Sequence, residues 1–402
     1  MQQILPVQLK NLAKACPFPL YAVGGACRDF LAGLEPKERD WDICAPVPFE
    51  LFARVAAECG WRVAAVFART GSVKAEYDGL ACEFTSFRSD VYAEGGHSPS
   101  EVKFTFDMAE DARRRDFTCN AVYYDICGGQ FVDPLGGAAD ISAKLLRPCI
   151  PAEELFVRDA LRVLRLARFC GELGFSPAEG CMPAAASAVP LLPLQPPALV
   201  WRELKGIFGA DEKYGLAGGA QTALGCLHAV GALRPLFGAE SASEERVAAA
   251  VRSAGLVPSR LRLAAFMCAL GLTSERLNPA WPIPKACASR LSSLLSCAYS
   301  SNCSSAFVRD NHTVVDDAAA VLRAAGAEER ANALCRAFDR LKKSGVPFDL
   351  SELAVGGNEL LAAGVPARQV GSVLNKLLAD CADGGLKNEK EELIRRAVQY
   401  RT

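Results

Sequence analysis

Two carboxylates one residue apart, Asp40 and Asp42, constrain what the first third of this chain can form. Residues 41–45 have the composition of a strand, and residues i and i+2 of a strand point to the same face, so both carboxylates can reach one site. Two adjacent anionic groups are costly unless a divalent cation lies between them. Asp-x-Asp also occurs by chance at polar strand ends, so the pair alone leaves both interpretations open.

Further groups near this pair strengthen the first interpretation. The run VGGACRD precedes it, and the backbone N–H groups around Gly24 and Gly25 can be approached closely by an anion. Arg28 adds a permanent planar cation suited to phosphate. Glu83 lies on a predicted strand as a rim residue, a salt-bridge partner or a third metal-site carboxylate. Together these residues indicate magnesium and a nucleoside triphosphate.

The predicted secondary structure changes near residue 150. Before it, helices are predicted near 5–15 and 49–59, and strands at 20–23, 41–45, 62–67, 71–77 and 80–87. The polar segment 89–101 contains glycine and proline and is predicted to be a mobile loop. After residue 150 helical periodicity dominates, and 156–175 reads as one helix closed by Gly174. The pattern predicts an α+β head followed by helical parts.

Bulk composition limits the class of protein. A chain of 402 residues allows two to four domains, and a net charge of −1 excludes a broadly basic surface without excluding a local phosphate-binding track. The 17 cysteines form no C-x-x-C pair and no cluster of zinc spacing, which favours reduced thiols used as small apolar residues. No apolar run reaches membrane-spanning length. We expect a cytoplasmic enzyme or binding protein.

An arginine run and a later helix provide further candidates. Three adjacent arginines at 113–115 are often solvated surface, but Asp116 can hold one guanidinium while another faces phosphate. Asp159 and Arg162 are i, i+3 neighbours in the predicted helix, and Arg165 and Arg168 continue the same spacing. Asp159 and Arg162 form either a surface salt bridge or an acceptor and a fork of donors that complement a base edge.

The order of these motifs resembles a known family. The stretches VGGACRD, RDWDI, CEFTSFRSD, RRRDFTCNA, DPLGGAADISAKLLR and RDALRVLRLARFCGELGF are similar to the class II tRNA nucleotidyltransferases, the CCA-adding enzymes, and to bacterial poly(A) polymerases. The resemblance covers residues 20–210, and the C-terminal segments are similar to the Bacillus-type tail. It implies an α+β fold with a mixed five-stranded sheet in a head (1–147), then a helical neck (148–210), body (211–345) and tail (346–402).

The resemblance also implies an activity and a set of site residues. The implied reaction is template-independent addition of CCA to the 3′ end of tRNA from CTP and ATP, with tRNA held along the body and tail. Two magnesium ions would be held by Asp40 and Asp42, and the implied catalytic residues are Asp40, Asp42 and Glu83. The implied nucleotide-binding residues are Gly24, Gly25, Arg28, Arg114, Arg115, Asp116, Asn120, Asp159, Arg162, Arg165 and Arg168.

Two departures from the family pattern leave alternatives open. Arg158 stands where the base-reading motif usually has glutamate, and the loop Glu94-Gly95-Gly96-His97-Ser98-Pro99 lacks the arginine associated with adenosine addition. A CC-adding enzyme and a poly(A) polymerase are therefore alternatives within the class. A catalytically silent RNA-binding module is the alternative from a different class, and the retained carboxylates Asp40, Asp42 and Glu83 argue against it.

Overall fold

The computed structural model describes residues 1, 3–36, 40–92, 99–301, 303–382 and 384–400. The chain forms two compact units. The first comprises Met1–Ser241 with Asn278–Pro282, and the second comprises Ala242–Leu277 with Ile283–Thr402. The expected head and neck both fall within the first unit, and the expected body is divided between the two. The finer four-part division stays a prediction.

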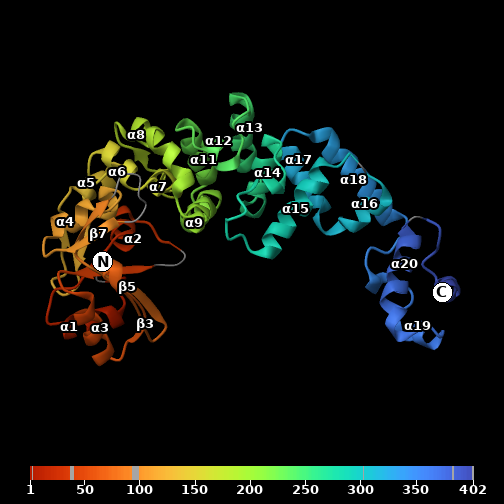
Figure 1. The fold of residues 1–402 in the computed structure, drawn as a ribbon, viewed down its shortest axis with the longest axis horizontal. Coiled ribbons are helices and arrows are strands. Elements are labelled where there is room, and N and C mark those ends of the chain that lie inside the picture. The colour runs from red at the N-terminus through yellow and green to blue at the C-terminus, as the bar shows by residue number, and fades with distance from the viewer. Residues whose placement is uncertain (2, 37–39, 93–98, 302, 383, 401–402) are drawn as a thin grey trace. The chain divides into compact units, whose positions relative to one another are not determined.

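A mixed sheet forms the N-terminal part of the first unit (Figure 1). Its strands are β1 (Tyr21–Val23), β2 (Trp41–Ala45), β3 (Arg62–Phe67), β4 (Ser72–Tyr77), β5 (Leu80–Ser86), β8 (Tyr123–Asp125) and β9 (Phe131–Val132). Over the described residues the order is β3-β4-β5-β2-β1-β8-β9, with β2 and β5 parallel and the other neighbours antiparallel. The mixed sheet is confirmed, but the expected five strands are too few. Strands β8 and β9 are too short to show an alternating pattern in the sequence.

A hairpin replaces part of the expected mobile loop. Strands β6 (Arg88–Tyr92) and β7 (Pro99–Phe104) pair antiparallel, so the prediction of a loop over 89–101 is wrong at both ends. Arg88, at the start of β6, has partners outside this hairpin: its backbone N–H donates to Asp111 at 3.3 Å, and its guanidinium donates to the Thr70 carbonyl. Residues 93–98, which include most of the Glu94–Pro99 loop, lie outside the described residues.

Helices pack against the sheet through apolar faces. Helix α3 (Phe49–Glu58) buries Phe49, Phe52, Val55 and Ala56, the spacing of one helical face. The ring of Phe52 stacks on that of Phe84 from β5 with centroids 3.9 Å apart. Full burial of such a side chain contributes about 2–3 kcal/mol. The other helices of this region are α1 (Val7–Ala15), α2 (Gly25–Ala32), α4 (Met108–Arg113) and α5 (Gly137–Ser142).

The helix expected at 156–175 is two helices. Helix α6 (Ala152–Arg158) ends at Asp159, whose φ of −153° and ψ of 99° are extended, and α7 (Leu161–Leu173) follows. The Asp159 carboxylate accepts the backbone N–H of Leu161 at 3.1 Å, an alternative to continuing the helix. Apolar positions keep their helical phase across this break, which explains why the sequence pattern hides it.

Helix α7 is the packing centre of the helical part of the first unit. A Cβ atom added at Gly171 would lie 2.3 Å from the carbonyl oxygen of Gly219, so glycine permits the close approach of α11 (Gly219–Ala229). The Trp201 ring stacks on Trp281 at 5.6 Å. The remaining elements of this part are β10 (Leu145–Leu146), β11 (Ser176–Pro177), α8 (Cys181–Ala188), α9 (Pro197–Phe208), α10 (Ala210–Tyr214), α11 (Gly219–Ala229) and α12 (Leu233–Phe237).

The second unit is helical throughout its described residues. Its helices are α13 (Glu244–Gly255), α14 (Ser259–Leu270), α15 (Lys285–Tyr299), α16 (Ser305–Asp310), α17 (Val315–Ala324), α18 (Glu328–Lys343), α19 (Gly357–Ala362), α20 (Val370–Ala382) and α21 (Lys390–Gln399). The last three enclose an apolar cluster around Leu360, Leu377 and Leu393. In the described part of the chain, none of the helices combines the length and apolar composition needed to cross a bilayer.

Candidate active site

Every site residue expected from the sequence lines one cavity of about 780 Å³ in the first unit. The expected residues that line it are Gly24, Gly25, Arg28, Asp40, Asp42, Glu83, Arg114, Arg115, Asp116, Asn120, Asp159, Arg162, Arg165 and Arg168. The sheet, the segment after α4 and helix α7 supply them, so residues more than a hundred positions apart meet here. Their individual roles stay predictions.

The glycine turn lies against the carboxylates. Gly24 has φ of +75°, and a Cβ atom added there would lie 3.1 Å from Oδ2 of Asp42. A side chain at this position would be strained and would crowd the carboxylate. Gly24 therefore allows the turn to approach Asp42 and begins α2, which carries Arg28.

The three carboxylates lie at the sheet side of the cavity. Asp42 on β2 is the register neighbour of Glu83 on β5, and Asp40 directly precedes β2. Asp42 is open to the cavity but surrounded by protein, and this desolvation raises the pKa of its carboxyl; Arg115 opposes the shift, while Glu83 and Asp40 add to it. The sheet side therefore concentrates negative charge.

The carboxylate chemistry fits a hard cation, with one qualification for Glu83. Over the described residues, neither Asp40 nor Asp42 has an ion-pair partner within 4 Å, and oxygen ligands of this kind suit magnesium. Glu83 pairs with Lys74 at 3.7 Å. No three His, Cys, Asp or Glu side chains of the described chain are grouped closely enough for a metal site, so Asp40 and Asp42 are the better candidates.

The arginine run is held by a carboxylate that the sequence did not indicate. Nε of Arg114 donates to Asp111 at 2.7 Å, and Nη2 of Arg115 donates to its other oxygen at 3.0 Å. Burial opposes ionisation of Asp111, but the two guanidinium groups outweigh it and hold its pKa below the usual range. The expectation that Asp116 holds one of these arginines is wrong.

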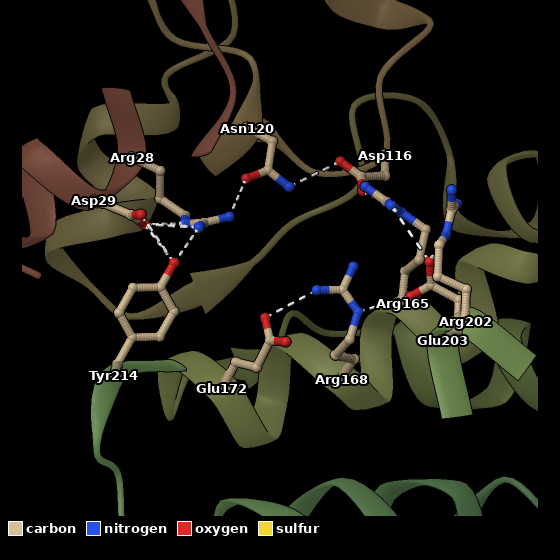
Figure 2. A network of polar contacts seen from close by, with 10 residues as sticks. All are labelled: Arg28, Asp29, Asp116, Asn120, Arg165, Arg168, Glu172, Arg202, Glu203 and Tyr214. Atoms are coloured by element: carbon tan, nitrogen blue, oxygen red, sulfur yellow. Dashed lines mark hydrogen bonds and ion pairs between the residues drawn. The ribbon is translucent and has the colours of Figure 1, made fainter. Parts of the chain in front are cut away.

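Asp116 instead lies in a network that joins α2 to α7 (Figure 2). Nη1 of Arg28 donates to Oδ1 of Asn120 at 2.7 Å, and Nδ2 of Asn120 donates to Asp116 at 3.0 Å. Nε of Arg165 donates to the other oxygen of Asp116 at 2.8 Å. Burial raises the pKa of Asp116, but Arg165 and the hydrogen bonds prevail, so its pKa is below the usual range.

The other arginines of α7 are also fixed by partners. Nη2 of Arg162 donates to the carbonyl of Arg114 at 2.8 Å, and its Nε lies 3.8 Å from Asp159. Arg168 donates to Glu203 at 2.7 Å and to Glu172 at 2.9 Å. These contacts set the directions of the guanidinium groups before any ligand enters.

Arg158 does not line the cavity. Its guanidinium pairs with Glu154 one helical turn earlier on α6, and both side chains are partly exposed to solvent. Arg158 is the last residue of α6, whereas Asp159 lies in the link between α6 and α7. The arginine that departs from the family motif is therefore outside the polar network of the cavity.

Sequence reasoning missed several residues of this site. Asp29 pairs with Arg28, Glu203 holds arginines of α7, and Tyr214 contacts the Arg28–Asp29 pair. Glu203 did carry a signal, because it is a carboxylate between Val200, Leu204 and Ile207 on the apolar face of α9. Tyr214 carried none, since its partners lie 185 or more positions earlier.

Comparisons with known proteins agree on the family. The model of the poly A polymerase head domain matches residues 20–147. A CCA-adding enzyme of Geobacillus thermodenitrificans is 37% identical over 175 residues, 44% of this chain and 42% of that protein. One of Geobacillus stearothermophilus is 32% identical over 269 residues, 66% of this chain and 63% of that protein. The aligned part thus spans less than two thirds of either relative.

Solved structures extend the likeness over almost the whole chain. The Bacillus stearothermophilus CCA-adding enzyme in complex with CTP superimposes with a TM-score of 0.72 at 26% identity, covering 98% of this chain and 96% of that one. The Thermotoga maritima CCA-adding enzyme complexed with tRNA gives 0.64 at 16% identity, with coverage of 98% and 94%, and supports the fold alone. The chain is therefore similar to CCA-adding enzymes over almost its whole length, and its residues 20–147 match the poly A polymerase head domain.

Proposed function

We propose that this protein adds CCA to the 3′ end of tRNA without a nucleic-acid template, using CTP and ATP and releasing pyrophosphate. The observation that carries the proposal is one cavity in which Asp40 and Asp42 share the lining with arginines from α2, the segment after α4, and α7. The relatives named as CCA-adding enzymes support the same reaction.

Asp40 and Asp42 hold two magnesium ions in this proposal, with Glu83 beside them. The raised pKa of Asp42 reflects an electrostatic cost that a bound cation removes. When bound, magnesium lowers the pKa of a coordinated hydroxyl and neutralises phosphate charge. The protein supplies the fixed carboxylates and a positioned cavity, so its own contribution is orientation and charge stabilisation.

Arg28, Arg114 and Arg115 bind the triphosphate and sugar beside the Gly24-Gly25 turn. Their guanidinium groups are pre-positioned by Asp29, Asn120 and Asp111, which reduces the entropy lost when a phosphate binds. Their positive charge stabilises the leaving pyrophosphate, where negative charge accumulates during the reaction.

Asp159 and Arg162 read the base. They offer an acceptor and a fork of donors, and the hydrogen bond from Arg162 to the Arg114 carbonyl fixes the direction of the guanidinium group. Bidentate pairing of this kind is worth about 1–3 kcal/mol of discrimination. Arg165 and Arg168 form the adjacent wall, fixed by Asp116, Glu203 and Glu172.

The tRNA lies along the helical body and tail in this proposal, recognised by its backbone and A-form shape. Its 3′ hydroxyl enters the cavity from the open side and attacks the α-phosphate of the nucleotide. The expected cellular location is the cytoplasm, where tRNA and nucleoside triphosphates occur together.

One assay tests the proposal against its alternatives. The protein is incubated with magnesium, labelled CTP or ATP, and tRNA transcripts that lack CCA, end in C, end in CC, or are complete. We expect two cytidines and then one adenosine. Arrest after two cytidines identifies a CC-adding enzyme, and long adenosine tails identify a poly(A) polymerase. No incorporation on any transcript, with tRNA binding intact, identifies a silent RNA-binding module.

A further inference from the structure

We propose that Lys213 and Tyr214, adjacent residues at the end of α10, form a second triphosphate-binding element. Lys213 contacts the phosphates directly, and Tyr214 positions both Lys213 and Arg28. This inference rests on the proposed function, because it assumes that the cavity takes a nucleoside triphosphate. Neither residue belongs to the motifs that the sequence indicated.

Tyr214 is hydrogen-bonded to Arg28, the arginine of α2 that is proposed to bind the triphosphate. Its hydroxyl lies 2.9 Å and 3.0 Å from the two carboxylate oxygens of Asp29, and Nη2 of Arg28 donates to the same hydroxyl at 2.9 Å (Figure 2). Arg28 and Asp29 are buried, with exposed fractions of 2% and 3%. The tyrosine therefore joins α10 to α2 across an interval of 185 residues.

The Tyr214 hydroxyl is one of the hydrogen-bond partners that fix Arg28. Nε and Nη2 of Arg28 donate to Asp29, Nη1 donates to Asn120, and Nη2 also donates to Tyr214. With three partners on different elements, the guanidinium plane cannot rotate without breaking a buried hydrogen bond, which is costly. The direction that Arg28 presents to the cavity is thus set partly by a residue of α10.

Lys213 is a cavity cation of a different kind. It lines the cavity, and its Nζ lies 5.5 Å from the centroid of the Tyr214 ring. Within the described residues no carboxylate lies within 4 Å of its ammonium group, whereas the cavity-lining arginines each contact a carboxylate. A partly buried ammonium without an anionic partner is suited to an anion supplied by the ligand.

The position of Lys213 identifies that anion. Tyr214 joins it to Arg28 rather than to the base-reading pair Asp159 and Arg162, so Lys213 lies at the Arg28 end of the cavity. The negative charge of a bound nucleotide is concentrated on its β- and γ-phosphates. Lys213 therefore binds the terminal phosphates, and CTP should depend on it far more than CMP.

Equilibrium binding of CTP and CMP, with magnesium and without tRNA, tests this directly. We expect Lys213→Met to weaken CTP binding by about tenfold or more, the effect of losing one charge-assisted hydrogen bond, and to leave CMP binding within about twofold. Lys213→Arg should restore most of the affinity. Lys205→Met is the matched control, because Lys205 is exposed on α9 outside the cavity lining.

Tyr214→Phe separates positioning from packing, since it removes only the hydroxyl. We expect it to raise KM for CTP by about threefold to tenfold with kcat within about twofold, because a ground-state phosphate contact is misaligned. Equal losses for CTP and CMP in the Lys213→Met protein would overturn the proposal, as would weakened tRNA binding with CTP affinity intact. The CTP and CMP binding measurements on Lys213→Met need no incorporation, so they stay decisive even where the CCA assay fails.

Discussion

The two sides of the cavity differ in whether their charged side chains are paired within the protein. On the sheet side, Asp40 and Asp42 have no ion pair among the described residues, and desolvation by the surrounding protein raises the pKa of Asp42. On the helix side, the arginines of α7 each have a carboxylate partner, and the buried Glu203 contacts two of them. The first side holds charge that a ligand must neutralise. On the second side, the charges are already paired within the protein.

Because of this difference, a carboxylate on the first side should matter for the reaction, and a carboxylate on the second side should matter for the stability of the fold. Removing an unpaired carboxylate costs the fold little, because no internal partner is lost, but it removes the charge that a cation requires. Removing a buried, paired carboxylate leaves guanidinium groups without compensation and costs the fold several kcal/mol. Substitutions on the two sides should therefore have different effects on activity and on stability.

Asp42→Asn should abolish the reaction and leave the fold intact. We expect nucleotide incorporation to fall by at least about a thousandfold, because several kcal/mol of charge stabilisation depend on the bound cations. The thermal midpoint should stay the same or rise slightly in the absence of magnesium, since repulsion with Glu83 and Asp40 is relieved. A large fall in the midpoint would show that the sheet side is structural as well.

Glu203→Gln should have the opposite signature. Glu203 is 2% exposed and lies 2.7 Å from Nε of Arg168 and 3.8 Å from Nη1 of Arg165. Its neutralisation therefore removes one negative charge from beside these two guanidinium groups. We expect the first unit to lose about 3 kcal/mol of unfolding free energy in urea denaturation. Glu154→Gln, at an exposed pair, is the control and should change stability by less than about 0.5 kcal/mol. Similar losses in both variants would contradict the view that the paired charges on the helix side stabilise the fold.

Acid should weaken the paired side in a defined window. Asp111 and Asp116 have folded-state pKa values below the unfolded value, so their stabilisation is complete above about pH 4, the unfolded pKa of aspartate. It is lost as the pH falls further, and each such carboxylate contributes about 2 kcal/mol. Denaturation between pH 5 and 2 should show this loss, and Asp116→Asn should flatten the slope. An unchanged slope would contradict the assignment.

The sequence predicted which residues line the site better than it predicted the hydrogen bonds and ion pairs between them. Strands β3, β4 and β5 could be predicted because each is a short run rich in apolar residues that lies between turns. Every site residue expected from the motifs lines one cavity. Tyr214 could not be predicted, because its hydrogen bonds to Arg28 and Asp29 span 185 or more residues and leave no local pattern. Asp111 and Glu203 did carry local signals that the sequence prediction did not use: Asp111 has helical spacing to Arg114 and Arg115, and Glu203 is a carboxylate on the apolar face of α9. The break at Asp159 was hidden for a different reason, because one extended residue does not disturb the helical spacing of the apolar positions.

Arg158→Glu gives the smallest expected effect and bears on the choice between CCA and CC addition. Arg158 pairs with Glu154 outside the cavity lining, and its side chain is about one-third exposed, so it adds less than about 0.5 kcal/mol to stability. Arg162 is already directed by the Arg114 carbonyl at 2.8 Å and by Asp159. We therefore expect the ratio of CTP to ATP incorporation to change by less than about twofold, well under the discrimination of one bidentate pair. A larger change would mean that residue 158 reaches the base when nucleotide binds, and that the paired side is less rigid than its contacts indicate.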